Sequence, residues 1–305
     1  MRIAITGSSG LVGRALAASL LGDGHEVVRL VRREPRATVP DGSTEVRWDP
    51  KTGFVAPEAF AGVDAMVHLA GAGVADHRWT KAYKQEIRDS RVIGTKTLAD
   101  WYAGLSAESR PSVFVSCSAI GYYGDTGGEP VDESGPPASD FLAKLCVEWE
   151  AAAEPARQVG IRTVHPRMGV VIARGGGAFG KLLPFAKAGL GGRLGSGRQY
   201  WSVISLADTV AALRYTIDTP ELSGPVNFTS PEPVTNRDLT TALGRALHRP
   251  TVFPVPGFAL RLALGGFADS ILYSQRVLPG QLLNAGFQFT HPTAEAALKA
   301  ALDQV

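Results

Sequence analysis

At the start of the chain an apolar segment runs into a glycine-rich turn and then into an apolar segment of helical spacing, and few folds accommodate this order. RIAIT at residues 2–6 has the length and character of a short buried strand. LVGRALAASLL at residues 11–21 carries apolar side chains at helical spacing. Between and within these segments, Gly7, Gly10 and Gly13 recur at every third residue. This order predicts a strand–turn–helix unit whose turn can approach a ligand closely.

The spacing of the glycines, GxxGxxG, differs from the GxGxxG of many dehydrogenases, but its physical consequences are the same. Such glycines allow a tight turn, a close approach of the backbone to a pyrophosphate, and contact between helix and strand. The helix that begins near Leu11 directs its free N–H groups and the positive end of its dipole at the phosphates. A turn without a ligand is the alternative. The strand–turn–helix context favours a dinucleotide site.

The end of the second predicted strand, residues 26–31 (EVVRLV), indicates which dinucleotide binds. Val31 is followed by Arg32 and Arg33, and the first acidic residue is Glu34. NAD-specific sites place an acidic side chain here to hold the ribose 2′-hydroxyl, whereas arginine suits the 2′-phosphate of NADP. Two solvated arginines at a strand end are the alternative. The sequence favours NADP.

Strands and helices alternate through the next part of the chain. The remaining predicted strands are 45–48, 65–69, 112–118, 162–172 and 225–229, and the predicted helices are 81–102, 141–159 and 206–217. This alternation predicts an α/β, Rossmann-type doubly wound parallel sheet. We assign residues 1–230 to this domain and residues 231–305 to a small, mainly helical C-terminal lobe on the substrate side. The glycine-rich segment 174–198 is either a substrate loop or a connection.

Composition excludes several classes of protein. The 305 residues are 45% hydrophobic and 20% charged, as in ordinary globular proteins. A net charge of +2 is too close to balance to indicate nucleic acid or a membrane surface as a partner. There is no apolar run of transmembrane length and no signal-peptide pattern. Cys117, Cys146 and the histidines form no metal-ligand spacing. We therefore expect a cytoplasmic protein without a metal.

Several motifs together resemble the extended short-chain dehydrogenase/epimerase superfamily. They are TGSSGLVG (6–13), HLAGAG (68–73) and SCSAIGYYG (116–124). A finer resemblance is to a subgroup of epimerase-like proteins of uncharacterised substrate with an appended C-terminal domain of unknown function. It rests on RWTKAYKQEIRDSRVIGT (78–95), FLAKLCVEWE (141–150), PRMGVVIARGGGAFGKLLPF (166–185) and SQRVLPGQLLNAGFQFTHPT (274–293). The resemblance spans nearly the whole chain.

The resemblance implies a set of cofactor-binding residues. They are Gly7, Gly10, Leu11, Val12 and Gly13 at the pyrophosphate, Val31 and Arg32 at the 2′-phosphate, Leu69 and Ala70 beside the adenosine, Arg91 at a phosphate or ribose, Glu86 at the adenine, and Arg167 at the nicotinamide end. For Glu86 a plain surface helix charge is the alternative.

The resemblance also implies a catalytic serine, tyrosine and lysine. In the superfamily the tyrosine moves a proton at a substrate oxygen, the lysine lowers the tyrosine pKa, and the serine hydrogen-bonds the same oxygen. Ser118 matches the serine and Lys144 matches the lysine. The tyrosine position then falls on Asp140, which is equally suited to capping the helix that follows. Tyr122 offers a substitute phenol, with a packed aromatic ring as the alternative, so the expected catalytic set is Ser118, Tyr122 and Lys144.

Two classes of function remain open. One is an NADP-dependent oxidoreductase or epimerase acting on a hydroxyl or carbonyl of a small sugar-like or nucleotide-sugar substrate. The other is a regulatory or redox-sensing protein that holds NADP(H) without turnover, which the missing tyrosine supports. A homodimer is also left open, because the helices near residues 81–102 and 141–159 pair dimers in this superfamily.

Overall fold

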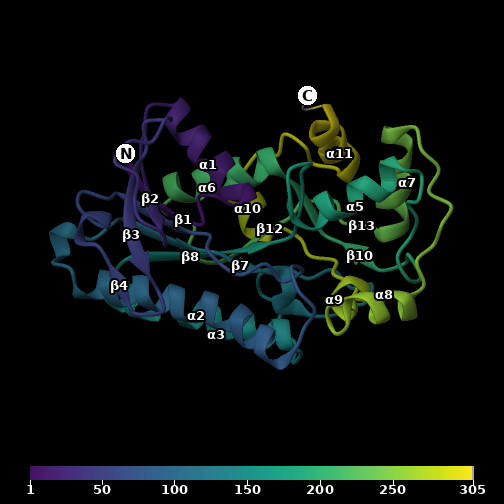
Figure 1. The fold of residues 1–305 in the computed structure, drawn as a ribbon, viewed down its shortest axis with the longest axis horizontal. Helices are drawn as coiled ribbons and strands as arrows, with labels where there is room; N and C mark the ends of the chain where they lie inside the picture. Colours follow the sequence, from purple (N-terminus) through teal and green to yellow (C-terminus); the bar gives the residue numbers. More distant parts are fainter. Residues whose placement is uncertain (304–305) are drawn as a thin grey trace.

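A computed structural model describes residues 1–303 of the chain, and its centre is a largely parallel sheet (Figure 1). In this described part the sheet has nine strands in the order β12-β8-β6-β5-β1-β2-β3-β4, with β7 beside β8. The strands are β1 (Arg2–Thr6), β2 (Glu26–Val31), β3 (Thr44–Asp49), β4 (Phe54–Val55), β5 (Ala65–His68), β6 (Val113–Ser116), β7 (Ser118–Ala119), β8 (Arg162–Met168) and β12 (Gly224–Phe228). Only β4 runs antiparallel to its neighbour in this sheet. The doubly wound parallel sheet expected from the sequence is confirmed.

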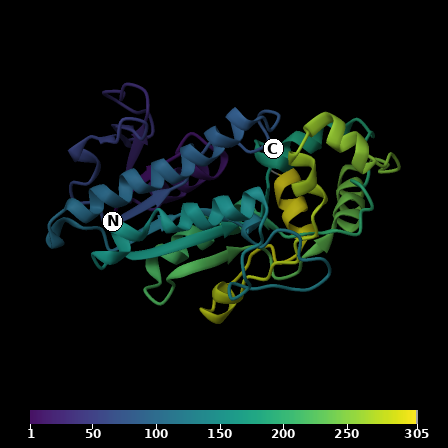
Figure 2. The ribbon, with the colours of Figure 1, turned by 90° about the horizontal axis from the view of Figure 1, so that it is seen from below.

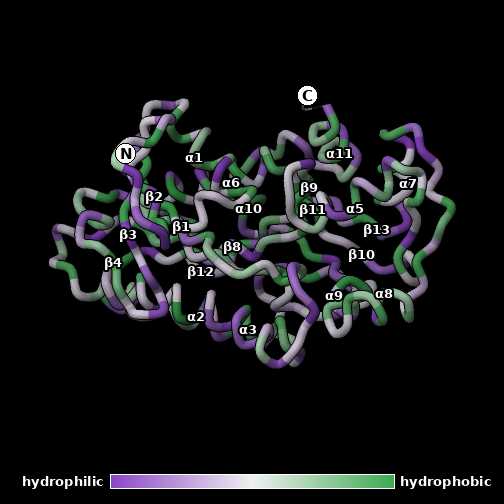
Figure 3. Tube along the Cα trace, viewed as in Figure 1, coloured by the Kyte–Doolittle hydropathy of each residue, from purple (hydrophilic) through white to green (hydrophobic). Residues whose placement is uncertain are grey.

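Helices cover both faces of the sheet. Successive strand residues point to opposite sides, and here the residues on both sides are apolar, so both faces need to be covered. One face packs on α1 (Leu11–Gly22) and α6 (Leu206–Asp218), and Ile3 and Ile5 of β1 point to it. The other face packs on α2 (Lys81–Gly104) and α4 (Glu154–Gln158), and Ala4 points to it. Two further helices, α3 (Phe141–Ala151) and α10 (Gly280–Asn284), lie beside α2 and β12 respectively. Figure 3 shows the apolar character of β1 and β2 between these layers.

The single helix expected over residues 141–159 is wrong in one respect, because the structure breaks it into α3 and α4. Pro155 lies in the first turn of α4. A proline inside a continuous helix would remove one hydrogen bond and clash with the preceding turn, so the chain ends one helix and begins another. The start of α3 is capped by Asp140, whose side chain accepts hydrogen bonds from the N–H groups of Leu142 and Ala143.

A smaller lobe lies at the end of the molecule opposite β3 and β4 (Figures 1 and 2). Its elements are α5 (Gly177–Lys187), α7 (Asn236–Leu247), α8 (Gly257–Leu264), α9 (Phe267–Leu272), α11 (Ala294–Asp303), the parallel pair β9 (Val170–Ile172) and β11 (Val203–Ser205), and the antiparallel pair β10 (Tyr200–Trp201) and β13 (Val234–Thr235). Phe179 of α5, Leu239 of α7 and Leu298 of α11 share one apolar core. The lobe therefore takes residues from both sides of position 230.

Short 3-10 helices at Pro57–Ala59, Ala107–Ser109 and Ile120–Tyr123 complete the regular structure. None of the described helices is both long enough and apolar enough to cross a membrane.

Candidate cofactor and catalytic site

The turn between β1 and α1 requires glycine at two positions and leaves a third open. Gly7 has a φ of +65°, and a Cβ there would lie 2.7 Å from the carbonyl carbon of Leu69. A Cβ at Gly13 would lie 2.3 Å from the Gly7 oxygen. Gly10 is the N-cap of α1, without a side-chain cap, and a Cβ there would meet only the Gly7 oxygen, at 3.2 Å. The first N–H groups of α1 are therefore accessible past Gly10 to a phosphate.

A buried pair, Thr6 and His68, joins the carboxyl ends of β1 and β5 beside this turn. The Thr6 hydroxyl accepts hydrogen bonds from the N–H groups of Leu69 at 3.1 Å and Ala70 at 3.3 Å. It lies 2.7 Å from Nδ1 of His68. The two N–H groups occupy both lone pairs of the hydroxyl, so the hydroxyl donates its one proton to Nδ1 of His68. The neutral imidazole therefore carries its proton on Nε2. This pair places Leu69 and Ala70, the expected adenosine-lining residues, against the glycine turn.

His68 gives the fold a specific sensitivity to acid. Burial, with a smaller effect of Arg91, lowers the pKa of His68 to about 3. The unfolded chain binds a proton below the ordinary histidine pKa of about 6.5, and the folded protein does not do so until the pH approaches 3. The contribution of His68 to the free energy of unfolding is therefore fully present above pH 6.5. Between pH 6.5 and about 3 it falls by about 1.4 kcal/mol per pH unit.

The comparison of wild type with His68→Asn by urea denaturation at pH 7.5 and 5.5 checks this. Burial also lowers the pKa of His165, so both proteins lose stability through that residue on acidification. Wild type is expected to lose about 1.4 kcal/mol more than His68→Asn over this interval. Equal losses would show that His68 is not held neutral.

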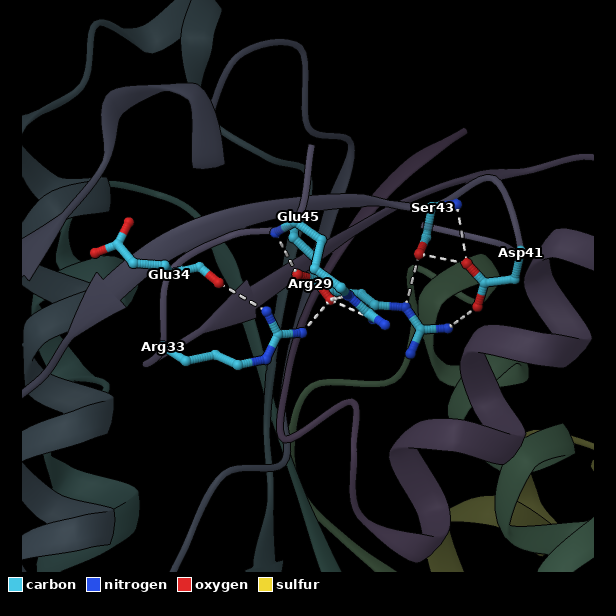
Figure 4. Close-up of polar contacts among 7 residues, drawn as sticks. Arg29, Arg33, Glu34, Asp41, Ser43 and Glu45 are labelled. Carbon is cyan, nitrogen blue, oxygen red and sulfur yellow. Dashed lines mark hydrogen bonds and ion pairs between the residues drawn. The ribbon is translucent and has the colours of Figure 1, made fainter. Parts of the chain in front are cut away.

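At the end of β2, the structure leaves one arginine unpaired. Thr6 lies opposite Leu30 in the parallel β1–β2 pair, so Val31 and Arg32 follow at the same edge of the sheet as the glycine turn. Arg32 is exposed, and no hydrogen bond or ion pair joins its side chain to another described residue. Arg33, in contrast, is bound to Glu45 (Figure 4). Arg32 is thus the cation that is free to meet a 2′-phosphate.

Arg91 is a second cation that lacks a carboxylate partner among the described residues. Its Nη1 donates to the carbonyl oxygens of Ala72 at 2.9 Å and Ile87 at 3.1 Å, and its Cζ lies 5.0 Å from the Trp149 ring. Burial lowers the pKa of Arg91. A Cβ on Gly71, just after β5, would lie 3.1 Å from the Cζ of Arg91. A desolvated cation with no counter-ion at this edge favours an anionic ligand.

The glycine-rich segment 174–198, expected as a substrate loop or a connection, borders the cofactor turn. A Cβ at Gly176 would lie 3.7 Å from the Leu11 Cβ, so the entry to α5 packs on the start of α1. Lys181 of α5 reaches Asp76 in the loop after β5, at 2.9 Å. The small lobe and the sheet thus meet beside the dinucleotide turn.

Two other expected cofactor residues make no polar side-chain contact within the described part of the chain. Val12 packs against the apolar core beneath α1. Glu86 is exposed on α2, and no described residue forms a hydrogen bond or ion pair with it.

Ser118 does not face an open cavity. It is 2% exposed, and its hydroxyl donates to Oε1 of Glu150 at 2.7 Å. The same carboxylate accepts two hydrogen bonds from Arg167, from Nε at 2.8 Å and from Nη2 at 2.9 Å. Burial opposes the charge on Arg167, but the hydrogen bonds and attraction of Glu150 outweigh it and raise the pKa of Arg167. The hydroxyl of Ser118 is therefore held by an ion pair between buried Arg167 and half-buried Glu150.

The same arginine also contacts both tyrosines of the GYYG motif. Nη1 of Arg167 donates to the Tyr123 hydroxyl at 2.8 Å, and that hydroxyl donates to Asn227 at 2.8 Å. Burial raises the pKa of Tyr123 to about 12. The Cζ of Arg167 lies 3.4 Å from the centre of the Tyr122 ring. The Tyr122 side chain is only partly buried, and its hydroxyl has no hydrogen-bond partner among the described residues.

The expected catalytic residues are thus only partly brought together. Ser118 and Tyr122 meet through Arg167, whereas Lys144 is exposed on α3 and has no hydrogen-bond or ion-pair partner in the described chain. Asp140 serves as the N-cap of α3. Glu150, the last residue of the FLAKLCVEWE motif, was not among the expected site residues. In the sequence Glu150 is only a glutamate at the end of an amphipathic helix. This pattern does not indicate that Glu150 binds Ser118 and Arg167.

Comparison with known proteins gives the family. The sequence model of the NAD dependent epimerase/dehydratase family matches residues 3–227, and that of a domain of unknown function (DUF1731) matches residues 255–301. An epimerase family protein of Mycobacterium bovis is 48% identical over 297 residues, covering 97% of this chain and 96% of that protein. The epimerase family protein YfhF of Bacillus subtilis is 33% identical, covering 98% and 97%.

Solved structures agree with these sequence matches. The human epimerase family protein SDR39U1, crystallised with NADPH, superposes with a TM-score of 0.88 at 30% identity and covers 100% of both chains. A nucleoside-diphosphate sugar epimerase of Corynebacterium glutamicum superposes with a TM-score of 0.79 at 35% identity, covering 99% of this chain and 58% of that one. On the sequence, the fold and these matches, the chain belongs to the NAD-dependent epimerase/dehydratase family.

Proposed function

We propose that this protein binds NADP(H) at the carboxyl edge of its sheet and uses it in an oxidoreductase or epimerase reaction. The substrate would be a hydroxyl or carbonyl of a sugar-like molecule or a nucleotide sugar. The observation that carries the cofactor assignment is the unpaired Arg32 at the end of β2, beside the glycine turn. The human relative crystallised with NADPH supports the same cofactor.

The described residues fit this cofactor. The N-terminus of α1 behind Gly10 would hold the pyrophosphate, and Arg32 would hold the 2′-phosphate. Arg91, a buried cation without a carboxylate, would face a phosphate or ribose, and Arg167 would lie toward the nicotinamide. When bound, the nicotinamide supplies or accepts a hydride.

The protein must also move a proton at the substrate oxygen, because hydride transfer to a carbonyl carbon, or from the carbon of a hydroxyl group, changes the charge on that oxygen. The Ser118 proton is committed to Glu150. Asp140 is committed to the cap of α3, where its carboxylate accepts two backbone hydrogen bonds. Tyr122 has a free hydroxyl on a ring held by Arg167, so we assign proton transfer to Tyr122.

A second candidate function is NADP(H) binding without turnover. It is favoured by the hydrogen bond from Ser118 to Glu150 and by the position of Lys144 on the surface of α3, which leave the usual catalytic triad unassembled. Solvent isotope exchange into a substrate, or consumption of NADPH, separates the two candidates. Exchange matters because an epimerase recycles its cofactor and gives no net absorbance change.

Arg32→Ala tests the cofactor assignment. Loss of a charge-assisted contact to the 2′-phosphate is expected to weaken NADPH binding by about tenfold or more and to change NADH binding by less than about twofold. Calorimetric titration of both cofactors measures this, with Arg245→Ala, an exposed arginine on α7, as the control. Equal wild-type affinities for NADPH and NADH would refute the assignment, and so would equal weakening of both by Arg32→Ala.

A further inference from the structure

The segment that follows β2, residues 32–43, is attached to β3 through a buried glutamate. The Glu45 side chain is 1% exposed, and its Oε1 accepts hydrogen bonds from Nη2 of Arg33 at 2.5 Å and Nη2 of Arg36 at 2.6 Å (Figure 4). Its Oε2 accepts the backbone N–H of Arg36 at 2.9 Å. One carboxylate therefore holds two side chains and one backbone group of the segment.

Other ion pairs attach the rest of the segment. Glu34 pairs with Arg47 of β3 at 2.8 Å. Asp41 pairs with Arg29 of β2 at 2.5 Å, and Asp41 also accepts a hydrogen bond from the Ser43 hydroxyl. Every charged side chain of residues 33–43 thus has a partner. Arg32 alone has none among the described residues.

This arrangement has consequences for both cofactors. Three arginines within five positions repel one another, and the Glu45 carboxylate, which binds two of them, offsets this repulsion. A segment that is already ordered loses less conformational entropy when a phosphate binds beside it. Glu45, opposite Arg29 on the neighbouring strand, is buried and occupied by Arg33 and Arg36, and Glu34 is paired with Arg47, so neither is free as the ribose-binding carboxylate that NAD sites use.

We propose that Glu45 is a positioning residue for cofactor choice. By binding Arg33 and Arg36, it orders the segment after β2 so that Arg32 alone is presented to the 2′-phosphate. This inference rests on the proposed NADP(H) site, and it adds a residue that acts on that site only through its neighbours.

Glu45→Gln in the full chain tests this, because it keeps the shape of the side chain and removes the charge that holds both arginines. NADPH binding is expected to weaken by about five- to tenfold, and NADH binding to change by less than about twofold. In the Arg32→Ala background, Glu45→Gln is expected to change NADPH affinity by less than about twofold, because the residue that it positions is gone. Glu45→Asp should restore part of the selectivity.

The control variant is Glu154→Gln, which breaks an exposed ion pair with Arg157 on α4 and should leave the affinities for both cofactors unchanged. Should Glu45→Gln fail to fold, Arg36→Gln removes one partner of the carboxylate and should lower the ratio of NADPH to NADH affinity by about threefold.

The outcomes distinguish the two proposals. A wild-type protein without preference for NADPH would overturn the proposed cofactor site and this inference together. A wild-type preference that Glu45→Gln leaves unchanged would overturn the role of Glu45 alone. The same conclusion would follow if Glu45→Gln weakened NADPH equally with and without Arg32.

Discussion

Gly10→Val is expected to raise the Kd for NADP(H) by about a hundredfold or more while the protein stays folded. A Cβ at this N-cap meets only the Gly7 oxygen, at 3.2 Å, a contact that a shift of a few tenths of an ångström would relieve. The branched side chain then stands where the pyrophosphate must approach the first N–H groups of α1. Calorimetric titration with NADPH measures the loss, and an unchanged circular dichroism spectrum shows that the fold is retained.

Two other glycines of α1 give matched controls. A Cβ at Gly22, near the end of the helix, meets nothing within 4 Å, so Gly22→Val should leave cofactor affinity unchanged. A Cβ at Gly13 would lie 2.3 Å from the backbone oxygen of Gly7, so Gly13→Val should destabilise the protein itself. Tight NADPH binding by folded Gly10→Val would mean that the phosphates bind elsewhere.

Tyr122→Phe is expected to lower kcat by about a hundredfold or more and to leave NADPH affinity within about twofold of wild type. The change removes only the hydroxyl that we assign to proton transfer, and the phenylalanine ring can still lie against Arg167. A substrate must first be found by screening sugars and nucleotide sugars for NADPH absorbance changes and for isotope exchange from solvent. The kcat of wild type and variant is then compared on that substrate.

Asp140→Asn is the control for this assignment, because asparagine also caps helices and preserves the start of α3. It should change kcat little. Loss of activity in Asp140→Asn, with activity retained in Tyr122→Phe, would show that the proton moves through the residue at the usual tyrosine position. Tight NADPH binding with no signal from any substrate would favour the second candidate function.

The sheet and the dinucleotide turn were readable from the sequence because their causes are local. A strand, a turn that needs glycine at Gly7 and Gly13, and a helix follow one another within the first 22 residues. Steric limits on the backbone and the spacing of apolar residues act over such short distances. The break between α3 and α4 is also local, and Pro155 was the available sign of it.

The small lobe shows the limit of reading by segments. Residues before position 230, in α5 and β9, pack with α7 and α11 from after it. Apolar residues indicate that a segment is buried, but they do not indicate which distant segment covers it.

Which charged groups of the site are paired depends on the tertiary structure. Arg32 and Arg33 are adjacent in the sequence and chemically identical, yet one is free and the other is bound to Glu45 on the next strand. Ser118 matches the catalytic pattern, but its hydroxyl is held by Glu150, which lies 32 residues away. The sequence indicated where most strands, the turn and most helices form, and which cations and hydroxyls to expect near the site. The fold decided which of them are paired, because a hydrogen bond or ion pair exists only where packing brings two distant side chains within about 3 Å and excludes water from them.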